Sequence, residues 1–497
     1  MLSLEQLSQT VKEHLGLNEF VDGIQYTCKW TIDESPLGGR GLIASEDIMP
    51  GEVLFVDRPL IYGPRSGANV EQGCTVCGKL DSDTSYKCDK CSLLLCSEQC
   101  QNTNIHFNDC GIISRWNINT PIEDDNSNVL SRSLTPIRAL MLNDDQRIFL
   151  ASLQAHRLPQ HGAEIRNLKQ YYEIPEEEEQ LMLLACCALD TNAYQIATAY
   201  GKREMSMRGL YPVSGLMNHN CVPNTRYYFN GDLQMTVKAV KPIRAGTEIF
   251  SCYSGILWGT PARRTHLYKT KHFLCKCDRC SDPTEGGTLL GALKCFSTEC
   301  SGNLLPIDPL KSSSPWRCLQ CNMRVPDENV RAVQGALGSL MGSLNFESVQ
   351  ELESFLINRI TKYVPKTNQI VVDLQCRLIW AFGEVEGYRW HELSESRLAL
   401  KESLCRGTLR TVAALGVGDA HLRGLLLYHL HAALAERARR SPDLYEEIKS
   451  EIESTIEQAY IILQGDISAP PDLELRRRYL GPGCDKPQEE RFFILDA

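Results

Sequence analysis

Closely spaced cysteines constrain this chain more than any other feature of its sequence. Seven of its 22 cysteines lie with one histidine between residues 74 and 110, in the runs CTVC, CDKC, CSEQC and HFNDC. Cysteines that are only small buried hydrophobes do not recur in such pairs, whereas zinc ligands do. Eight ligands suffice for two tetrahedral zinc sites: Cys74, Cys77, Cys88, Cys91, Cys96, Cys100, His106 and Cys110. Residues 37–110 hold too few apolar positions for an independent core, so bound metal must supply folding energy.

Two further cysteine groups follow. CKCDRC provides Cys275, Cys277 and Cys280, which leave a structural zinc one ligand short. The fourth ligand could be water, as in a catalytic site, or a distant cysteine, for which Cys221 is the best candidate. The pairs Cys295/Cys300 and Cys318/Cys321, 17 residues apart, are typical of a zinc ribbon. We therefore expect about four zinc ions, and core packing for the other seven cysteines: Cys28, Cys186, Cys187, Cys252, Cys376, Cys405 and Cys484.

Length and charge limit the class of protein. A chain of 497 residues with 43% hydrophobic content predicts about two to four domains. The net charge of −10 gives no general attraction to nucleic acid, although a local contact is compatible with it. Residues 1–17 predict an amphipathic helix, and no apolar run reaches the ~18 residues of a membrane span. We expect neither secretion nor membrane insertion, and hence reduced cysteines.

The remaining sequence predicts a split β region followed by helices. Residues 234–240 and 247–253 predict strands, and DIMPGEVLF at 47–55 parallels PIRAGTEIF at 242–250, each a glycine turn leading into a strand. The intervening insertion holds the cysteine-rich segment and a predicted helix over 173–196, whose glutamates suit its first turn. Beyond residue 326, runs at 389–415, 419–440 and 441–463 predict stacked antiparallel helices.

Four ordered motifs carry a family resemblance. PLGGRGLIAS at 36–45, NHNCVPN at 218–224, GTEIFSCYSG at 246–255 and FLCKCDRC at 273–280 resemble the signatures of a SET domain and its post-SET cysteines. Since the inserted cysteine-rich segment resembles a MYND zinc finger, the chain resembles the SMYD family of protein lysine methyltransferases. The added ribbon and KHFLCKCDRC most resemble the arthropod SmydA branch. Motifs in this order are far more specific than any one alone.

The resemblance implies an α+β fold class: a β-rich SET fold with an inserted MYND zinc finger, a post-SET zinc site, a zinc ribbon and a C-terminal α-helical, tetratricopeptide-like domain. The expected segments are 1–73 (N-terminal helix and first SET segment), 74–110 (MYND finger), 111–200 (helical SET insertion), 201–254 (core SET segment), 255–283 (post-SET), 284–325 (zinc ribbon) and 326–497 (C-terminal helical domain).

The resemblance also implies roles for single residues. Cys74, Cys77, Cys96 and Cys100 would hold one zinc ion, Cys88, Cys91, His106 and Cys110 a second, and Cys221 would complete the post-SET site. S-adenosylmethionine would contact Gly39, Arg40, Gly41, Asn192, Asn218, His219, Tyr253 and Phe273, with Tyr253 as the catalytic residue. The residues alone leave plainer alternatives: GGRG as a hairpin turn, His219 as a hydrogen-bonded core histidine, and Phe273 as packing beside a zinc knuckle.

The function implied is S-adenosylmethionine-dependent N-methylation of lysines in histone or non-histone proteins, in the cytoplasm or nucleus. The alternative is a catalytically weak adaptor whose MYND finger binds proline-containing peptides of transcriptional corepressors. One departure bears on this choice, because Lys271 stands where the family usually has a tyrosine lining the lysine channel. Either its ammonium projects into the channel and weakens activity, or it turns outward while His272, Tyr227 or Tyr228 lines the channel.

Overall fold

The computed structural model describes residues 2–17, 20–21, 24–25, 28–67, 71, 73–80, 85–120, 128–158, 160–492 and 494. The chain forms two compact units. The first comprises Met1–Asn218, Tyr227–Ile249 and Gly465–Ala469, and the second comprises His219–Arg226, Phe250–Gln464 and Pro470–Ala497. The chain therefore changes unit at residues 218/219, 226/227, 249/250, 464/465 and 469/470, whereas the segments expected from the sequence are contiguous.

Short antiparallel sheets form the β region. One has the order β13-β16-β4-β3, one β14-β15-β5 and one β11-β12-β6. The predicted strands lie at β15 (Met235–Ala239) and β16 (Glu248–Ser251). The others are β3 (Trp30–Glu34), β4 (Arg40–Ala44), β5 (Val53–Asp57), β6 (Ile61–Pro64), β11 (Tyr194–Gln195), β12 (Met207–Leu210), β13 (Asn218–His219) and β14 (Thr225–Phe229). Leu42, Phe55 and Val237 belong to the core beneath these strands.

The two similar turns noted in the sequence lie against each other in the first unit. Ile48 and Ile243 exchange both backbone hydrogen bonds, with N···O distances of 2.8 and 2.9 Å. Gly51 and Gly246 follow at φ 86° and 80°, a left-handed conformation that glycine adopts without a steric penalty. This pairing joins the two halves of the β region that the insertion separates.

The insertion shares one core with the cysteine-rich finger. Leu93 and Leu95 of the finger belong to the same buried cluster as Leu130 and Leu134 of α4 (Val129–Ile137). The predicted helix over 173–196 is α7 (Glu176–Asn192), shorter because residues at both ends of the predicted range pair in strands. The other elements are α1 (Leu4–Leu15), β1 (Phe20–Val21), β2 (Ile24–Gln25), β7 (Tyr86–Lys87), β8 (Leu94–Leu95), α2 (Glu98–Gln101), α3 (Asn104–Ile113), β9 (Asn117–Ile118), a 3-10 turn (Arg138–Met141), α5 (Asp144–Ser152), α6 (Ala163–Leu168), β10 (Tyr172–Glu173) and a 3-10 turn (Ser214–Leu216).

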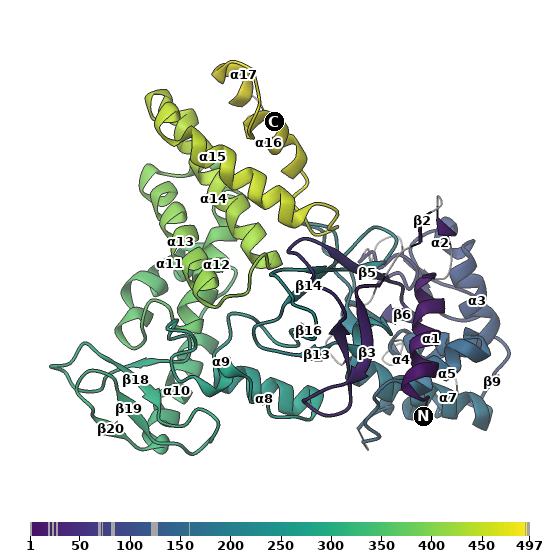
Figure 1. Ribbon diagram of the computed structural model, residues 1–497. Helices are drawn as coiled ribbons and strands as arrows, with labels where there is room; N and C mark the ends of the chain where they lie inside the picture. Colours follow the sequence, from purple (N-terminus) through teal and green to yellow (C-terminus); the bar gives the residue numbers. More distant parts are fainter. Residues whose placement is uncertain are drawn as a thin grey trace. The chain divides into compact units, whose positions relative to one another are not determined.

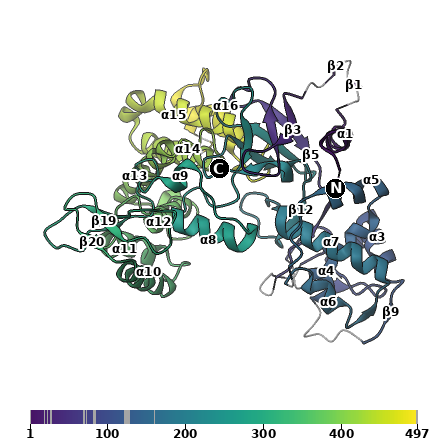
Figure 2. The same ribbon diagram turned by 60° about the horizontal axis from the view of Figure 1, so that its bottom comes forward.

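The second unit begins with two helices and a ribbon. These are α8 (Thr260–Lys271), α9 (Asp278–Ser281), β17 (Leu293–Lys294), β18 (Asn303–Pro306), β19 (Trp316–Cys318) and β20 (Arg324–Val325), the four strands pairing in chain order. Helices α11 to α15 then lie side by side (Figures 1 and 2), each packed on the next. Ribbon residues such as Leu304 and Trp316 share one core with these helices.

The predicted helical runs are α13 (Glu395–Ala414), α14 (His421–Arg440) and α15 (Pro442–Leu463). The first begins later than predicted because residues 390–392 form a 3-10 turn before the cap at Ser394. The remaining elements are α10 (Asp327–Gly342), α11 (Val349–Asn358), a 3-10 turn (Ile360–Lys362), α12 (Gln369–Ala381), α16 (Leu473–Leu480) and α17 (Gln488–Phe492).

The seven cysteines expected in the core divide into two groups. Cys186, Cys187 and Cys405 are buried, and Cys28 and Cys376 pack against the cores, as expected. Cys252 and Cys484 are only half-buried, and the Cys252 thiol donates to the carbonyl of Ser254 at 3.1 Å.

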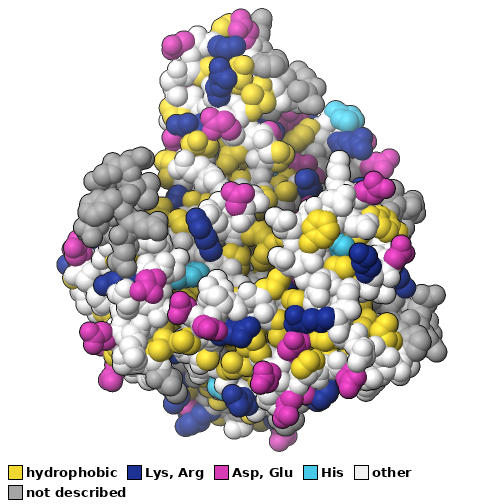
Figure 3. All heavy atoms as spheres, turned by 90° about the vertical axis from the view of Figure 1, so that its right-hand side faces the viewer, with side chains coloured by type: hydrophobic (Ala, Val, Ile, Leu, Met, Phe, Trp, Pro, Cys, Tyr) yellow, Lys and Arg dark blue, Asp and Glu magenta, His cyan; other side chains and the backbone are white. Residues whose placement is uncertain are grey.

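Charged side chains of both signs lie scattered over the face of the molecule shown in Figure 3. Among the described helices, none combines the length and apolarity needed to cross a bilayer. In Figure 3, acidic and basic side chains alternate over the visible described residues without a continuous basic area.

Candidate active site and zinc centres

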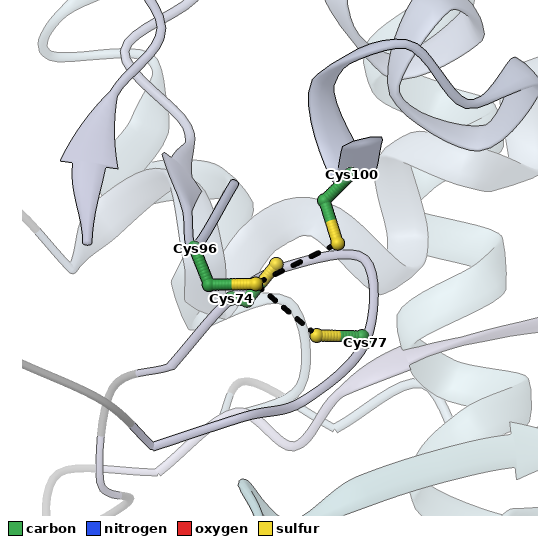
Figure 4. A group of neighbouring side chains, drawn as sticks. All are labelled: Cys74, Cys77, Cys96 and Cys100. Carbon is green, nitrogen blue, oxygen red and sulfur yellow. Dashed lines mark hydrogen bonds between the residues drawn. The ribbon is translucent and has the colours of Figure 1, made fainter. Parts of the chain in front are cut away.

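The finger brings its first four thiols together. Cys74 and Cys77 come from one turn, Cys96 follows β8, and Cys100 lies on α2, so that their sulfurs meet (Figure 4). The Sγ atoms of Cys77 and Cys96 are 3.5 Å apart, and those of Cys96 and Cys100 are 3.6 Å apart. Tetrahedral zinc with bonds of about 2.3 Å places its sulfurs about 3.8 Å apart. This group therefore fits a zinc ion without rearrangement.

Cys88, Cys91, His106 and Cys110 form the second group of the finger, with all ligand atoms within 4.8 Å of one another. Nε2 of His106 lies 3.6 Å from Sγ of Cys91. Nδ1 of His106 lies 2.7 Å from the carbonyl oxygen of Gln101, which can only accept, so Nδ1 carries the proton. The lone pair of Nε2 consequently faces the thiols, the tautomer that a zinc-binding histidine needs. The two sets interleave along the chain as the resemblance implies.

Cys221 lies with the three post-SET thiols. It is fully buried, and its Sγ is 3.5 Å from Sγ of Cys280 and 3.9 Å from Sγ of Cys275. All four sulfurs, including that of Cys277, lie within 4.8 Å of one another. Four protein ligands favour the structural interpretation over a catalytic site with an open position.

The zinc ribbon supplies the fourth group. Sγ of Cys295 lies 3.6 Å from Sγ of Cys321, and Sγ of Cys300 lies 3.7 Å from Sγ of Cys318. These distances again match a tetrahedral zinc–thiolate site. The four groups together could hold four zinc ions.

A buried arginine contacts the thiols of the post-SET group. Arg263 on α8 is fully buried, and its Nε and Nη2 lie 3.2 and 3.5 Å from the sulfurs of Cys221 and Cys280. Its Nη1 donates to Glu285 at 2.5 Å, and Arg279 pairs with the same carboxylate at 3.1 Å. Four thiolates around one Zn²⁺ leave a net charge of about −2, which a buried guanidinium offsets. The sequence gives no signal of this contact, because the residues of α8 are those of a solvent-facing helix.

Aromatic side chains pack on this same cysteine cluster. Tyr253 and Phe273 cover a small core made by the cysteines and Leu267. The His219 ring lies 5.2 Å from the Tyr253 ring and 5.8 Å from the Phe273 ring, measured between centroids. The cluster therefore positions the candidate catalytic tyrosine together with two candidate cofactor residues.

Both ring nitrogens of His219 are engaged inside the second unit. Nδ1 accepts from the backbone N–H of Tyr253 at 3.0 Å, and Nε2 lies 3.2 Å from the sulfur of Cys221. Burial lowers the pKa of His219 to about 4, so the imidazole is neutral near pH 7. The side chain thus matches a hydrogen-bonded core histidine, and a cofactor contact from this residue has to come from its backbone.

Gly41, Asn218 and Glu248 form a close-packed group in the first unit. The amide of Asn218 donates to the carbonyl of Arg40 at 2.9 Å and to the carboxylate of Glu248 at 2.7 Å. A Cβ atom on Gly41 would lie 2.3 Å from Oε1 of Glu248. A side chain at residue 41 would therefore force the Glu248 carboxylate, which accepts from Ser35 and Asn218, to shift. Sequence reasoning missed Glu248, whose only signal was a lone acid in the apolar run TEIF.

Arg40 and Gly39 offer groups that suit an anionic ligand. Nη2 of Arg40 donates to the carbonyl of Ser152 at 2.6 Å, while Nη1 is buried without a hydrogen-bond partner among the described residues. Gly39 has φ 75°, and open space surrounds the position of its missing Cβ. A buried guanidinium nitrogen of this kind can bind a carboxylate, which the methionine end of S-adenosylmethionine carries.

Asn192, the last residue of α7, directs its amide hydrogens to two carbonyls, of Gln154 at 2.7 Å and of Ala188 at 2.9 Å. Its Oδ1 remains the group that can accept a further hydrogen bond. The residues of the first unit therefore fit the cofactor chemically.

Lys271 turns toward Tyr253. Its Nζ lies 5.4 Å from the centroid of the Tyr253 ring. Tyr227 instead packs within the first unit, with ring centroids 5.0 Å from Tyr194 and 5.8 Å from Phe229. The Lys271 ammonium therefore lies near the candidate catalytic residue.

Known proteins similar in sequence to this chain identify its family. The SET domain family matches residues 39–254. SET domain-containing protein SmydA-8, isoform B, of Drosophila melanogaster is 30% identical over 434 residues, which cover 85% of this chain and 94% of that protein. The chain belongs to the SMYD family, in its SmydA branch.

More distant SMYD relatives extend the comparison. Histone-lysine N-methyltransferase SMYD3 of Mus musculus is 24% identical over 353 residues, covering 65% of this chain and 80% of that protein. A solved SET domain of LSMT bound to lysine and AdoHcy covers 99% of this chain at 13% identity with a TM-score of 0.31, which is too low to add to the argument. The α+β SMYD fold class predicted from the sequence is confirmed.

Proposed function

We propose that this SMYD protein is an S-adenosylmethionine-dependent protein-lysine N-methyltransferase. The observation that carries the proposal is the packing of Tyr253, His219 and Phe273 on the Cys221 cluster, with Tyr253 near the end of the segment that matches the SET domain. Relatives support it, since SMYD3 of Mus musculus and of Homo sapiens are both named histone-lysine N-methyltransferase.

The proposed cofactor contacts are assigned residue by residue, as the family resemblance implies. Nη1 of Arg40 takes the carboxylate, the turn at Gly39 and Gly41 lets the backbone approach, and Phe273 offers its ring to the adenine. Asn192 contributes Oδ1, while Asn218 and His219 contribute backbone groups because their side chains are engaged elsewhere. When bound, S-adenosylmethionine supplies a methyl group already activated on its sulfonium.

Tyr253 is the proposed catalytic residue, next to the reacting atoms. Its hydroxyl orients the nitrogen of the substrate lysine. The reaction depends mainly on aligning this nitrogen with the methyl group of the cofactor, and less on acid–base catalysis. Its backbone N–H donates to Nδ1 of His219, which fixes the backbone at this residue. The surrounding aromatic rings exclude water, and desolvation favours the neutral, nucleophilic amine over the ammonium.

The zinc ions have a structural role in this proposal. We assign the ligands as the four groups described, and the segments as those expected from the sequence: the MYND finger at 74–110, the post-SET segment at 255–283 and the ribbon at 284–325. The substrate is a protein with an accessible lysine, histone or otherwise, since a net charge of −10 suits basic peptides in general. The protein acts in the cytoplasm, the nucleus or both, where its thiols stay reduced.

A second candidate function is favoured by one observation, the ammonium of Lys271 directed at the Tyr253 ring. In this alternative the SET domain is a weak enzyme, and the function of the protein is the binding of peptides by the MYND finger. Phe107 on α3 is 57% exposed and offers an aromatic face of the kind that proline-containing peptides bind. Transcriptional corepressors would be the partners.

Two measurements decide between the methyltransferase and the adaptor. Calorimetry measures binding of S-adenosylmethionine, and a tritiated-methyl assay then measures transfer to proteins of a cell extract. Cofactor binding together with lysine-directed transfer is the expected result. Cofactor binding without transfer to any protein would reject the enzyme in favour of the adaptor.

A further inference from the structure

The position of Lys271 is set by the helix that carries it. Arg263, Leu267 and Lys271 are spaced by four residues and so share one face of α8. Arg263 contacts the sulfurs of the post-SET cluster, Leu267 is fully buried against that cluster, and Lys271 reaches the Tyr253 ring. Leu267, one turn before Lys271, and Arg263, two turns before it, therefore anchor the helix so that Lys271 faces Tyr253.

The end of α8 reinforces this placement. His272 follows Lys271 at φ 61°, the left-handed conformation that ends many helices. The chain reverses there, and Phe273, two residues beyond Lys271, faces His219 with ring centroids 5.8 Å apart. Lys271 thus contacts the Tyr253 ring and Phe273 the His219 ring, and these two rings are neighbours, with centroids 5.2 Å apart.

We propose that Lys271 competes within the chain for the place at the Tyr253 ring that the substrate lysine must take. The inference rests on the proposed function, because it assumes that Tyr253 receives a lysine. The substrate lysine approaches Tyr253 as an ammonium and becomes the neutral amine only once it is desolvated there, so during its approach it and the Lys271 ammonium repel each other. The substrate lysine must displace Lys271, so its apparent affinity is lower by the cost of that displacement.

The contact itself is tested by chemical labelling, without any enzymatic activity. Limiting acetic anhydride should acetylate Lys271 more slowly than Lys269, which is exposed and lies on another face of the same helix. Tyr253→Phe keeps a ring and should keep this protection, whereas Tyr253→Leu should remove it. Equal labelling of Lys271 in the wild type and in Tyr253→Leu would overturn the contact.

Competition is tested by peptide binding in the presence of S-adenosylhomocysteine. The probes are an unstructured heptapeptide with one central lysine and its twin with norleucine at that position. Lys271→Gln should tighten binding of the lysine peptide by about 2- to 30-fold, the range of a cation–ring contact. Binding of the norleucine peptide should not change, and neither should either affinity in the control Lys269→Gln.

An unchanged or weaker affinity of Lys271→Gln for the lysine peptide would overturn the inference. So would equal binding of the lysine and norleucine peptides by the wild type and both variants. Methyl transfer is scored separately with tritiated cofactor. If Lys271→Gln binds the lysine peptide more tightly but no variant transfers a methyl group, the competition stands and the proposed enzymatic function fails.

Discussion

Replacing Arg263 by methionine should loosen one zinc ion of four. The side chain is fully buried and places two N–H groups against the thiols of Cys221 and Cys280, at 3.2 and 3.5 Å. Methionine is unbranched, fills much of the same space and donates no hydrogen bond. Glu285 keeps Arg279 as a partner at 3.1 Å, so the change leaves no unpaired buried carboxylate. The change also removes the hydrogen bonds of Arg263 to Glu285, to the Trp258 carbonyl and to Thr260, so the free energy of unfolding should fall as well. The effect specific to the metal site is the loss of the two contacts with the thiolates.

The size of the effect follows from these contacts. A hydrogen bond to a charged group contributes about 1.5 to 3 kcal/mol. Loss of one such contribution corresponds to about a 10- to 100-fold weaker metal site, which is also the usual effect of removing a residue that supports a metal ligand. We expect an effect of this size at the post-SET group and none at the finger or ribbon.

The assay is the transfer of zinc to the chromogenic chelator 4-(2-pyridylazo)resorcinol. The wild type should release its ions slowly, and Arg263→Met should release one of the four early. Arg264→Met is the matched control, because Arg264 is also buried on α8 but donates to the carbonyls of Cys275, Pro309 and Leu310 and to no sulfur in the described contacts. Identical release curves for the two variants would refute the thiolate contact.

Four further results are expected. Tyr253→Phe should abolish methyl transfer and leave the affinity for S-adenosylmethionine nearly unchanged, because only the hydroxyl next to the reacting atoms is lost; an unchanged rate would mean that Tyr253 is not catalytic. Elemental analysis should find about four zinc ions per chain, and two or fewer would contradict the ribbon and post-SET sites. Gly41→Ala should lower the melting temperature more than Gly231→Ala, since a Cβ at Gly41 would lie 2.3 Å from the Glu248 carboxylate whereas Gly231 faces open space without a left-handed φ; equal shifts would argue against the close approach. Burial lowers the pKa of Lys401 from 10.5 to about 8, so between these pH values the unfolded chain binds more protons than the folded chain. The free energy of unfolding should therefore rise with pH across this window, by up to about 3 kcal/mol relative to Lys401→Met. Urea denaturation at several pH values measures this difference.

The zinc groups could be predicted because their information is local. Spacings of two to four residues place thiols on one turn, and the chemistry of the metal supplies the rest. Cys221, 54 residues before Cys275, could be named only because a three-cysteine group lacked a fourth ligand. The long helices of the second unit were also predictable, since their apolar period extends over about twenty residues.

Residues whose role depends on distant partners were not predictable. Arg263 belongs to a helix with the composition of a surface helix, and its burial is decided by Glu285 and the thiols of the cysteine cluster. Lys401 is fully buried because it donates to the carbonyls of Ile379 and Phe382 at 2.6 Å, contacts that no periodic pattern encodes. The orientation of Lys271 likewise depends on where Tyr253 lies.

The pairing of Ile48 with Ile243 has a consequence for the order of events during synthesis. This contact, and that of β4 with β16, cannot form until the ribosome has made about two hundred further residues, whereas the eight finger ligands are complete at Cys110. From Cys110 to Ser251 the chain grows by 251 − 110 = 141 residues. At about 5 to 20 residues per second this takes roughly 7 to 28 s. The finger can thus bind its metal on the nascent chain while β4 is paired with β3 but still lacks β16. Zinc-starved cells should therefore accumulate chains that fail before this sheet is complete.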